Sequence, residues 1–135
     1  MSYTFISDRR YRMPTHFGPS LGPRQGPDGK GFSGANSTKD TVIQATFEAE
    51  AEQLEQFLPP GFILRQPCTV TLIFAYATNI AWLAGRGYST FGVSIPARYC
   101  GQKDQVNGDL LLIFWENMAD PIITGREDLG FAKLY

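Results

Sequence analysis

Apolar and β-branched residues alternate with polar ones over most of the chain beyond its first forty residues, in the pattern of half-buried strands. Residues 41–47 (TVIQATF), 62–66 (FILRQ) and 68–79 (CTVTLIFAYATN) each predict a strand. The third is so continuously apolar that we expect burial on both faces. Residues 88–101 and 110–117 predict two further strands. The pattern therefore predicts a β-rich α+β chain with meander-like connections.

One segment has helical spacing instead. Residues 48–58 (EAEAEQLEQFL) are strong helix formers, with Leu54, Phe57 and Leu58 on one face. Two prolines and a glycine at 59–61 are expected to end this helix.

Glycine and proline mark the expected turns. Residues 85–87 (GRG) and 125–127 (GRE) predict turns, and Asn107-Gly108 predicts the tight turn of a hairpin. Pro96, inside a predicted strand, indicates a sheet edge or a bulge, because proline has no N–H for the ladder.

The first forty residues differ in composition from the rest. Residues 1–40 are rich in Gly, Pro, Ser and charge, and hold too little apolar material for a core of their own. Tyr11, His16 and Phe17 are spaced between the prolines. The pattern fits a disordered arm as well as an extended arm laid over the body or a neighbouring subunit. We divide the chain into this arm and a folded region, 41–135.

Composition excludes several classes of protein. The 135 residues are 43% hydrophobic and 19% charged, which suits one domain with a hydrophobic core. A net charge of −1 provides no basic surface for nucleic acid. Cys68 and Cys100 have no metal-like spacing with the single histidine, so we expect free thiols and no metal site. Because the sequence shows neither the apolar core of a signal peptide nor an apolar run long enough for a membrane span, we expect a cytoplasmic protein that does not enter a membrane.

The candidate chemistry lies in one lysine near the end of the chain. Lys133 stands in an apolar segment with Leu129, Phe131, Ala132, Leu134 and Tyr135. Its stem could pack on the core while its charged head reaches water. Alternatively, low dielectric disfavours an ammonium, so a buried lysine can present a free amine that attacks a ketone. The resulting protonated imine withdraws electrons, which serves decarboxylation, aldol chemistry and dehydration. The pattern alone leaves both roles open.

Three stretches resemble the acetoacetate decarboxylase superfamily: residues 11–25 (YRMPTHFGPSLGPRQ), 87–101 (GYSTFGVSIPARYCG) and 125–135 (GREDLGFAKLY). The most specific match is Gly-Arg-Glu followed by an aromatic residue and the lysine, with Ala132 where proline is usual. The resemblance implies that Lys133 forms the Schiff base, a role for which acetoacetate decarboxylase is the standard example. It also implies a barrel-like antiparallel sheet with few helices, an oligomer, a small carbonyl substrate, and no metal or organic cofactor.

The chain also departs from the family pattern. Leu134 stands where true decarboxylases have a second lysine. Thr90 and Leu72 stand at or near the positions of two pocket glutamates, and Asp40 lies near the position of an expected arginine. The resemblance therefore implies a divergent branch that decarboxylates keto acids or condenses and dehydrates them. Two rivals are an enzyme that uses the pocket without an imine, such as a cyclase or isomerase, and a non-catalytic ligand-binding protein.

Further residues of types that bind or protonate a carbonyl substrate are candidates for the same pocket: His16, Tyr76, Tyr88, Thr90, Glu116 and Arg126. The arginine is either an anion clamp or half of a structural ion pair with Glu127. The tyrosines and threonine are proton donors or packing residues, and Glu116 is an acid/base group or, more commonly for such a position, a solvated turn residue. His16 would cap the pocket.

Members of the resembled family are longer than this chain, and their remaining strands follow the lysine motif. A sheet that stopped after residues 131–135 would leave an apolar edge unpaired and the lysine near a solvated terminus. We therefore expect a C-terminal companion chain, cleaved from the same polypeptide or separately encoded. A truncated piece is the alternative.

Overall fold

The computed structural model describes residues 6–9, 11–12, 20–21, 25–26, 28–31 and 38–135. The chain divides into two compact units. The smaller comprises Met1–Lys39 with Ala77–Gly87, and the larger comprises Asp40–Tyr76 with Tyr88–Tyr135.

The smaller unit contains short elements. Strand β1 (Tyr11–Arg12) pairs antiparallel with β2 (Ser20–Leu21). A 3-10 helix, η2 (Ala81–Leu83), lies just before the turn predicted at residues 85–87. Its residue Leu83 and its N-cap Ile80 are buried. The division of the chain into an arm and a folded region at residue 40 stays a prediction.

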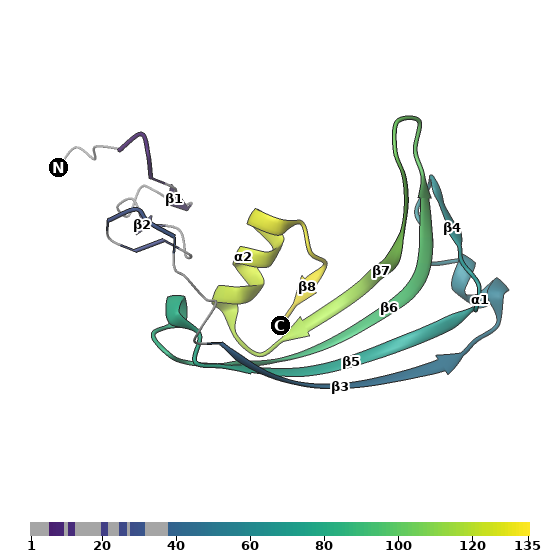
Figure 1. Cartoon of the computed structure of the whole chain (residues 1–135), viewed down its shortest axis with the longest axis horizontal. Helices are drawn as coiled ribbons and strands as arrows, with labels where there is room; N and C mark the ends of the chain where they lie inside the picture. Colours follow the sequence, from purple (N-terminus) through teal and green to yellow (C-terminus); the bar gives the residue numbers. More distant parts are fainter. Residues whose placement is uncertain (1–5, 10, 13–19, 22–24, 27, 32–37) are drawn as a thin grey trace. The chain divides into compact units, whose positions relative to one another are not determined.

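The larger unit is built on an open sheet with the strand order β3-β5-β6-β7-β8, and β4 pairs with β6 beside this path (Figure 1). The strands are β3 (Lys39–Glu48), β4 (Phe62–Leu64), β5 (Thr69–Thr78), β6 (Tyr88–Cys100), β7 (Gln105–Glu116) and β8 (Lys133–Leu134). The β4–β6 and β6–β7 pairs are antiparallel, and β7–β8 is parallel. The predicted β-rich, mainly antiparallel fold with few helices is confirmed.

Two short α-helices complete the larger unit. Helix α1 (Ala51–Glu55) is about half as long as the predicted helix. Pairing in β3 takes the chain as far as Glu48, and the helix ends at Glu55 with Gln56 as its C-cap, before the prolines that were expected to end it. Leu54 is its buried anchor. Helix α2 (Ala119–Leu129) packs on β7 and β8, on the concave side of the curved strands (Figure 1).

The hairpin between β6 and β7 does not turn where the sequence predicted. Asn107 and Gly108 lie inside β7 and pair with β6. The chain reverses at residues 101–104, where the Gly101 N–H donates to the Asp104 carbonyl at 3.0 Å. The long apolar pairing of the two strands sets the register and overrides the local preference of Asn-Gly.

β6 lies inside the sheet, between β5 and β7, so Pro96 does not mark an edge. The register shifts between Val93 and Ser94, whose partners in β7 are Ile113 and Leu111. The predicted bulge is therefore present, and it lies just before the proline.

Strand β5 is not buried on both faces, contrary to the prediction. Phe74 and Tyr76 are 47% and 52% exposed. They lie on the face turned away from α2, which no described element of the larger unit covers. A continuous apolar run shows that both faces are apolar, but it does not supply a layer for each. No helix among the described residues has the length and apolar character needed to span a membrane.

Candidate active site

The segment that carries the lysine is positioned by helix α2 and its end. Pro121 lies in the first turn of α2, where its missing N–H is tolerated. Gly130 ends the helix with a φ of 72°, a left-handed conformation that favours glycine. The chain then returns along β7, with Lys133 beside Phe114. The turn predicted at residues 125–127 is wrong, because these residues lie within α2.

The Lys133 amine is buried between α2 and the sheet. The exposed fraction of its side chain is 9%. Its Nζ lies 2.7 Å from Oε1 of Glu116 and donates to the backbone carbonyl of Pro121 at 3.2 Å. The rings of Phe114 and Phe131 lie 5.6 and 5.5 Å from Nζ, within the range of a cation–π contact. The amine therefore has an apolar surround and one anionic partner.

Glu116 is not the solvated turn residue that its place at a strand end suggested. Its side chain is 0% exposed, since α2 folds back over the end of β7. Apart from the ion pair, neither carboxylate oxygen accepts a hydrogen bond from the described residues. Thr90, its cross-strand neighbour in β6, also has a buried Oγ1 without a hydrogen-bond partner among them. Glu116 and Thr90 thus keep unused hydrogen-bonding capacity in a mostly apolar surround.

Two glycines provide the space that the lysine occupies. A Cβ on Gly125 would lie 2.6 Å from Nζ of Lys133 and would also overlap the stem of that side chain. A Cβ on Gly92 would lie 2.6 Å from the Phe114 ring, which packs beneath the amine. Such distances are far inside van der Waals contact, so a side chain at either position must displace its neighbour. This gives a physical reason for glycine in both motifs.

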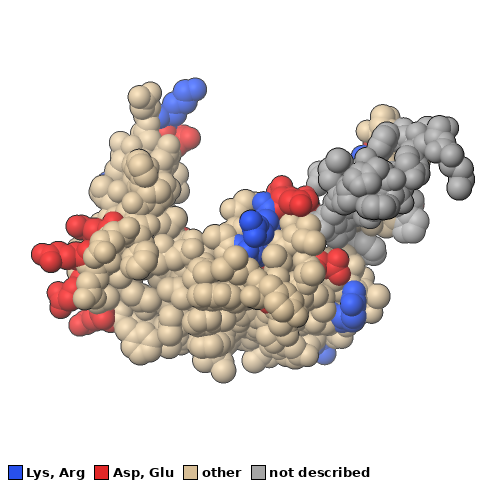
Figure 2. All heavy atoms as spheres, turned by 180° about the vertical axis from the view of Figure 1, so that it is seen from behind, with Lys and Arg blue, Asp and Glu red and all other residues tan. Residues whose placement is uncertain are grey.

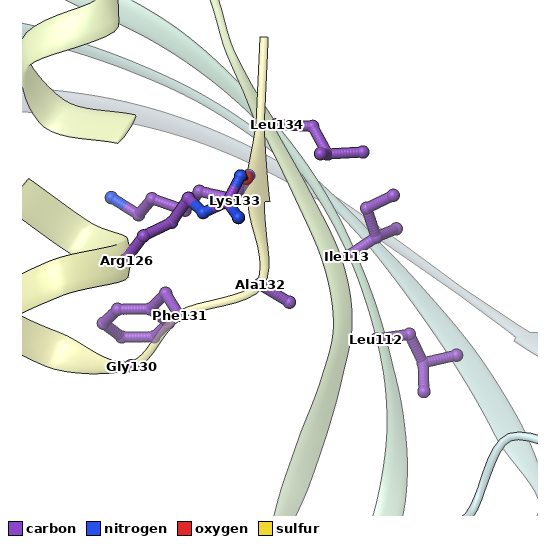
Figure 3. Close-up of a pocket in the computed structure, with 8 residues that line it drawn as sticks. All are labelled: Leu112, Ile113, Arg126, Gly130, Phe131, Ala132, Lys133 and Leu134. Carbon is purple, nitrogen blue, oxygen red and sulfur yellow. The ribbon is translucent and has the colours of Figure 1, made fainter. Parts of the chain in front are cut away.

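Arg126 lies beside the lysine rather than beside Glu127. Its Nη1 donates to the Lys133 carbonyl at 3.5 Å, and the described residues show no ion pair between the arginine and Glu127. The predicted structural pair is therefore wrong, because adjacent residues on a helix point in different directions. Figure 3 shows the arginine side chain reaching from α2 toward Lys133.

Arg126 and Lys133 line the same pocket, which has a volume of about 350 Å³. The rest of its lining is mostly apolar: Leu112, Ile113, Gly130, Phe131, Ala132 and Leu134. An open site of this size, with a cation at its wall, has room for a small organic acid.

The other candidates are only partly brought together. Thr90 lies opposite Glu116, but Tyr76 is exposed on β5 and Tyr88 is half-buried at the start of β6. Neither tyrosine lines the lysine pocket. His16 lies outside the described residues, so its capping role stays a prediction.

Sequence reasoning missed the direct contact between Glu116 and Lys133. A signal was available, because Glu116 ends a long apolar run and, two residues from Phe114, shares its face of the strand. The contact with the Pro121 carbonyl could not be predicted from residue types, because every residue has a backbone carbonyl.

The site thus consists of an open, mainly antiparallel sheet and helix α2, with Lys133 buried between them. Residues 12–135 match the family model of acetoacetate decarboxylase. The chain belongs to this family, and the resemblance drawn from its motifs is confirmed.

Solved structures share the fold. The enduracididine biosynthesis enzyme MppR complexed with pyruvate has a TM-score of 0.60 at 18% identity, over 84% of this chain and 49% of MppR. Acetoacetate decarboxylase from Legionella pneumophila has a TM-score of 0.55 at 24% identity, over 74% of this chain and 38% of that enzyme. Another acetoacetate decarboxylase structure has a TM-score of 0.63 at 17% identity, over 96% of this chain and 48% of that protein. The chain thus spans less than half the length of each. A comparison with curated protein sequences finds no match.

Proposed function

We propose that this chain carries the imine-forming lysine of a lyase that acts on a keto acid or a related carbonyl compound. The observation that supports it best is the buried amine of Lys133, 9% exposed, with one carboxylate within 2.7 Å and two aromatic rings around it. Such burial keeps water from an imine, which would otherwise be hydrolysed.

The proposed substrate class follows from the second cation in the pocket. The Arg126 guanidinium can bind a carboxylate through two parallel hydrogen bonds while the neighbouring lysine attacks the carbonyl carbon. The protonated imine then accepts the electrons of a C–C bond in decarboxylation, or stabilises a carbon nucleophile in aldol chemistry and dehydration. Pyruvate, bound in the MppR structure, is a keto acid of this kind.

One observation favours a rival function. The contacts of Nζ with Glu116 and the Pro121 carbonyl also suit a lysine that only holds α2 against the sheet. In that case the pocket would bind its ligand without a covalent bond, either for an isomerisation or cyclisation or as a binding site alone.

Reductive trapping separates these functions. The protein is mixed with pyruvate or acetoacetate, treated with borohydride and measured by intact-mass spectrometry. We expect a reduced adduct in the wild type and in Lys103→Ala, an exposed lysine used as control, and none in Lys133→Ala. An adduct that persists in Lys133→Ala, or no adduct in a folded wild type, contradicts the imine.

We also propose a companion chain that completes the sheet and covers its uncovered apolar face. The large exposed hydrophobic side chains of this face are Ile43, Phe47, Phe74 and Tyr76. A face of this kind in contact with water is unfavourable and usually marks an interface.

A further inference from the structure

We propose that Glu116 is the acid–base catalyst of imine formation: it takes a proton from Lys133 and returns it to the departing oxygen. This inference rests on the proposed function, because it assigns the proton transfers that an imine at Lys133 requires. The structure places a carboxylate oxygen 2.7 Å from Nζ, with 0% and 9% of the two side chains exposed.

The distance suits direct proton transfer, which needs donor and acceptor within hydrogen-bond reach. The other groups around Nζ are a backbone carbonyl and the rings of Phe114 and Phe131, which take no proton at neutral pH. Arg126 is permanently charged and takes none. Among the described groups that contact this amine, Glu116 is therefore the one proton acceptor.

The carboxylate also has capacity to spare. Its Oε2 and the Thr90 Oγ1 opposite are buried and accept or donate no hydrogen bond among the described residues. Buried polar atoms are rarely left without a hydrogen-bond partner. A hydroxyl formed on the substrate carbon would provide a partner for these atoms beside the lysine.

The steps balance in atoms and charge. The Lys133 ammonium gives a proton to Glu116, and the free electron pair on nitrogen forms a bond to the carbonyl carbon as the C=O π bond breaks. A second proton passes from nitrogen to oxygen and gives a neutral hydroxyl. Protonated Glu116 then donates to this hydroxyl, which leaves as water while the nitrogen pair forms the C=N bond. One positive charge enters on the ammonium and one leaves on the imine, and Glu116 ends as a carboxylate.

The test compares rates of adduct formation. Glu116→Gln keeps the size and an acceptor oxygen for Nζ, so the lysine remains positioned, but the amide cannot carry the proton. We expect borohydride-trappable pyruvate adduct to form roughly 100-fold more slowly or worse, the usual contribution of a general acid–base. Glu127→Gln, an exposed change with the same loss of charge, should form adduct at the wild-type rate.

The outcomes separate this inference from the function on which it rests. No adduct in folded wild-type protein overturns the imine at Lys133, and the role of Glu116 with it. Adduct in the wild type and an equal rate in Glu116→Gln overturns the role of Glu116 alone. If Glu116→Gln does not fold, Glu116→Asp is measured instead, since it keeps the charge and withdraws the carboxylate. A slower rate at an unchanged melting temperature supports the proposal, and an unchanged rate overturns it.

Discussion

At the scale of single residues, the site depends on one pair of buried charges. Transfer of an ammonium and a carboxylate from water is unfavourable, and their attraction offsets this cost only while both are present. Lys133 and Glu116 meet that condition at 2.7 Å, whereas the loss of either leaves the other buried alone. The pair is thus a weak source of net stability and a strong constraint on substitution.

Lys133→Met should lower the free energy of unfolding by about 3–5 kcal/mol, because the Glu116 carboxylate is left without its partner. Lys133→Met combined with Glu116→Leu should recover most of that loss. Urea unfolding of both variants gives the comparison, with the exposed Lys103→Met as a control that changes little. Equal stability of the single and double variants would show that the two groups are not coupled.

Gly125→Ala should both destabilise the protein and stop adduct formation. The added methyl overlaps the Lys133 stem, and such overpacking costs about 1–3 kcal/mol, which outweighs the gain in helix propensity of about 1 kcal/mol. Thermal unfolding and borohydride trapping report the two effects. Gly108→Ala, whose Cβ would meet nothing, is the matched control. A more stable Gly125→Ala that still forms adduct contradicts this account of the motif.

At the scale of elements, the end of α2 decides where the lysine lies. The left-handed Gly130 stops the helix, and the Phe131 N–H donates to the Gly125 carbonyl at 3.0 Å. Two residues later the chain joins β7 as β8, and the Phe114 N–H donates to the Ala132 carbonyl at 2.9 Å. The reversal places the lysine beneath the helix that precedes it.

Gly130→Ala isolates the contribution of this helix end. A Cβ there meets nothing within 4 Å, so the cost arises from the left-handed backbone alone and should be about 1–2 kcal/mol. We expect the melting temperature of Gly130→Ala to fall by several degrees. Gly108→Ala is the control, because the space around Gly108 is equally open but its φ is not positive. Adduct formation by the folded fraction should remain, since the β8 register does not depend on this side chain. An unchanged melting temperature would mean that the helix end tolerates another conformation.

At the scale of the molecule, the apolar face of the larger unit is the feature that the chain alone does not account for. Phe74, Phe91 and Trp115 form a stacked row on it, with ring centroids 4.6 and 5.4 Å apart. The lower edge of the view in Figure 2, formed by the strands, is almost without charged side chains. Aromatic residues in such a row bury well against a second layer.

Phe74→Glu should release the proposed companion chain, because burial of a carboxylate in an apolar interface is unfavourable. Native mass spectrometry of the purified protein should show a complex heavier than the 15.0 kDa chain for the wild type and for Val106→Glu, an exposed change on β7. The Phe74→Glu sample should show the complex lost or weakened. A wild-type chain that is stable and monodisperse at 15.0 kDa would contradict a companion.

The sequence by itself determined the strands and the candidate lysine. The alternation over residues 41–47 lies within β3, because side chains in a strand face opposite sides with a period of two. The apolar run predicted as a strand over 110–117 forms the end of β7 up to Glu116. Three motif stretches identified the family, and the spacing of Gly-Arg-Glu, the aromatic residue and Lys133 was the most specific of them. These signals are local, so they are readable without knowing what packs on them.

Only the tertiary structure decided which residues meet. Asn107-Gly108 has the strongest local turn preference, yet pairing along the whole of β6 and β7 holds it inside a strand. Glu116 is a strand-end carboxylate that would be solvated on most sheets. Its burial, and its contact with Lys133, exist because α2 ends at Gly130 and brings β8 back beside β7. Burial and charge pairing depend on packing between segments distant in the sequence, and a pattern of residue types does not contain that information.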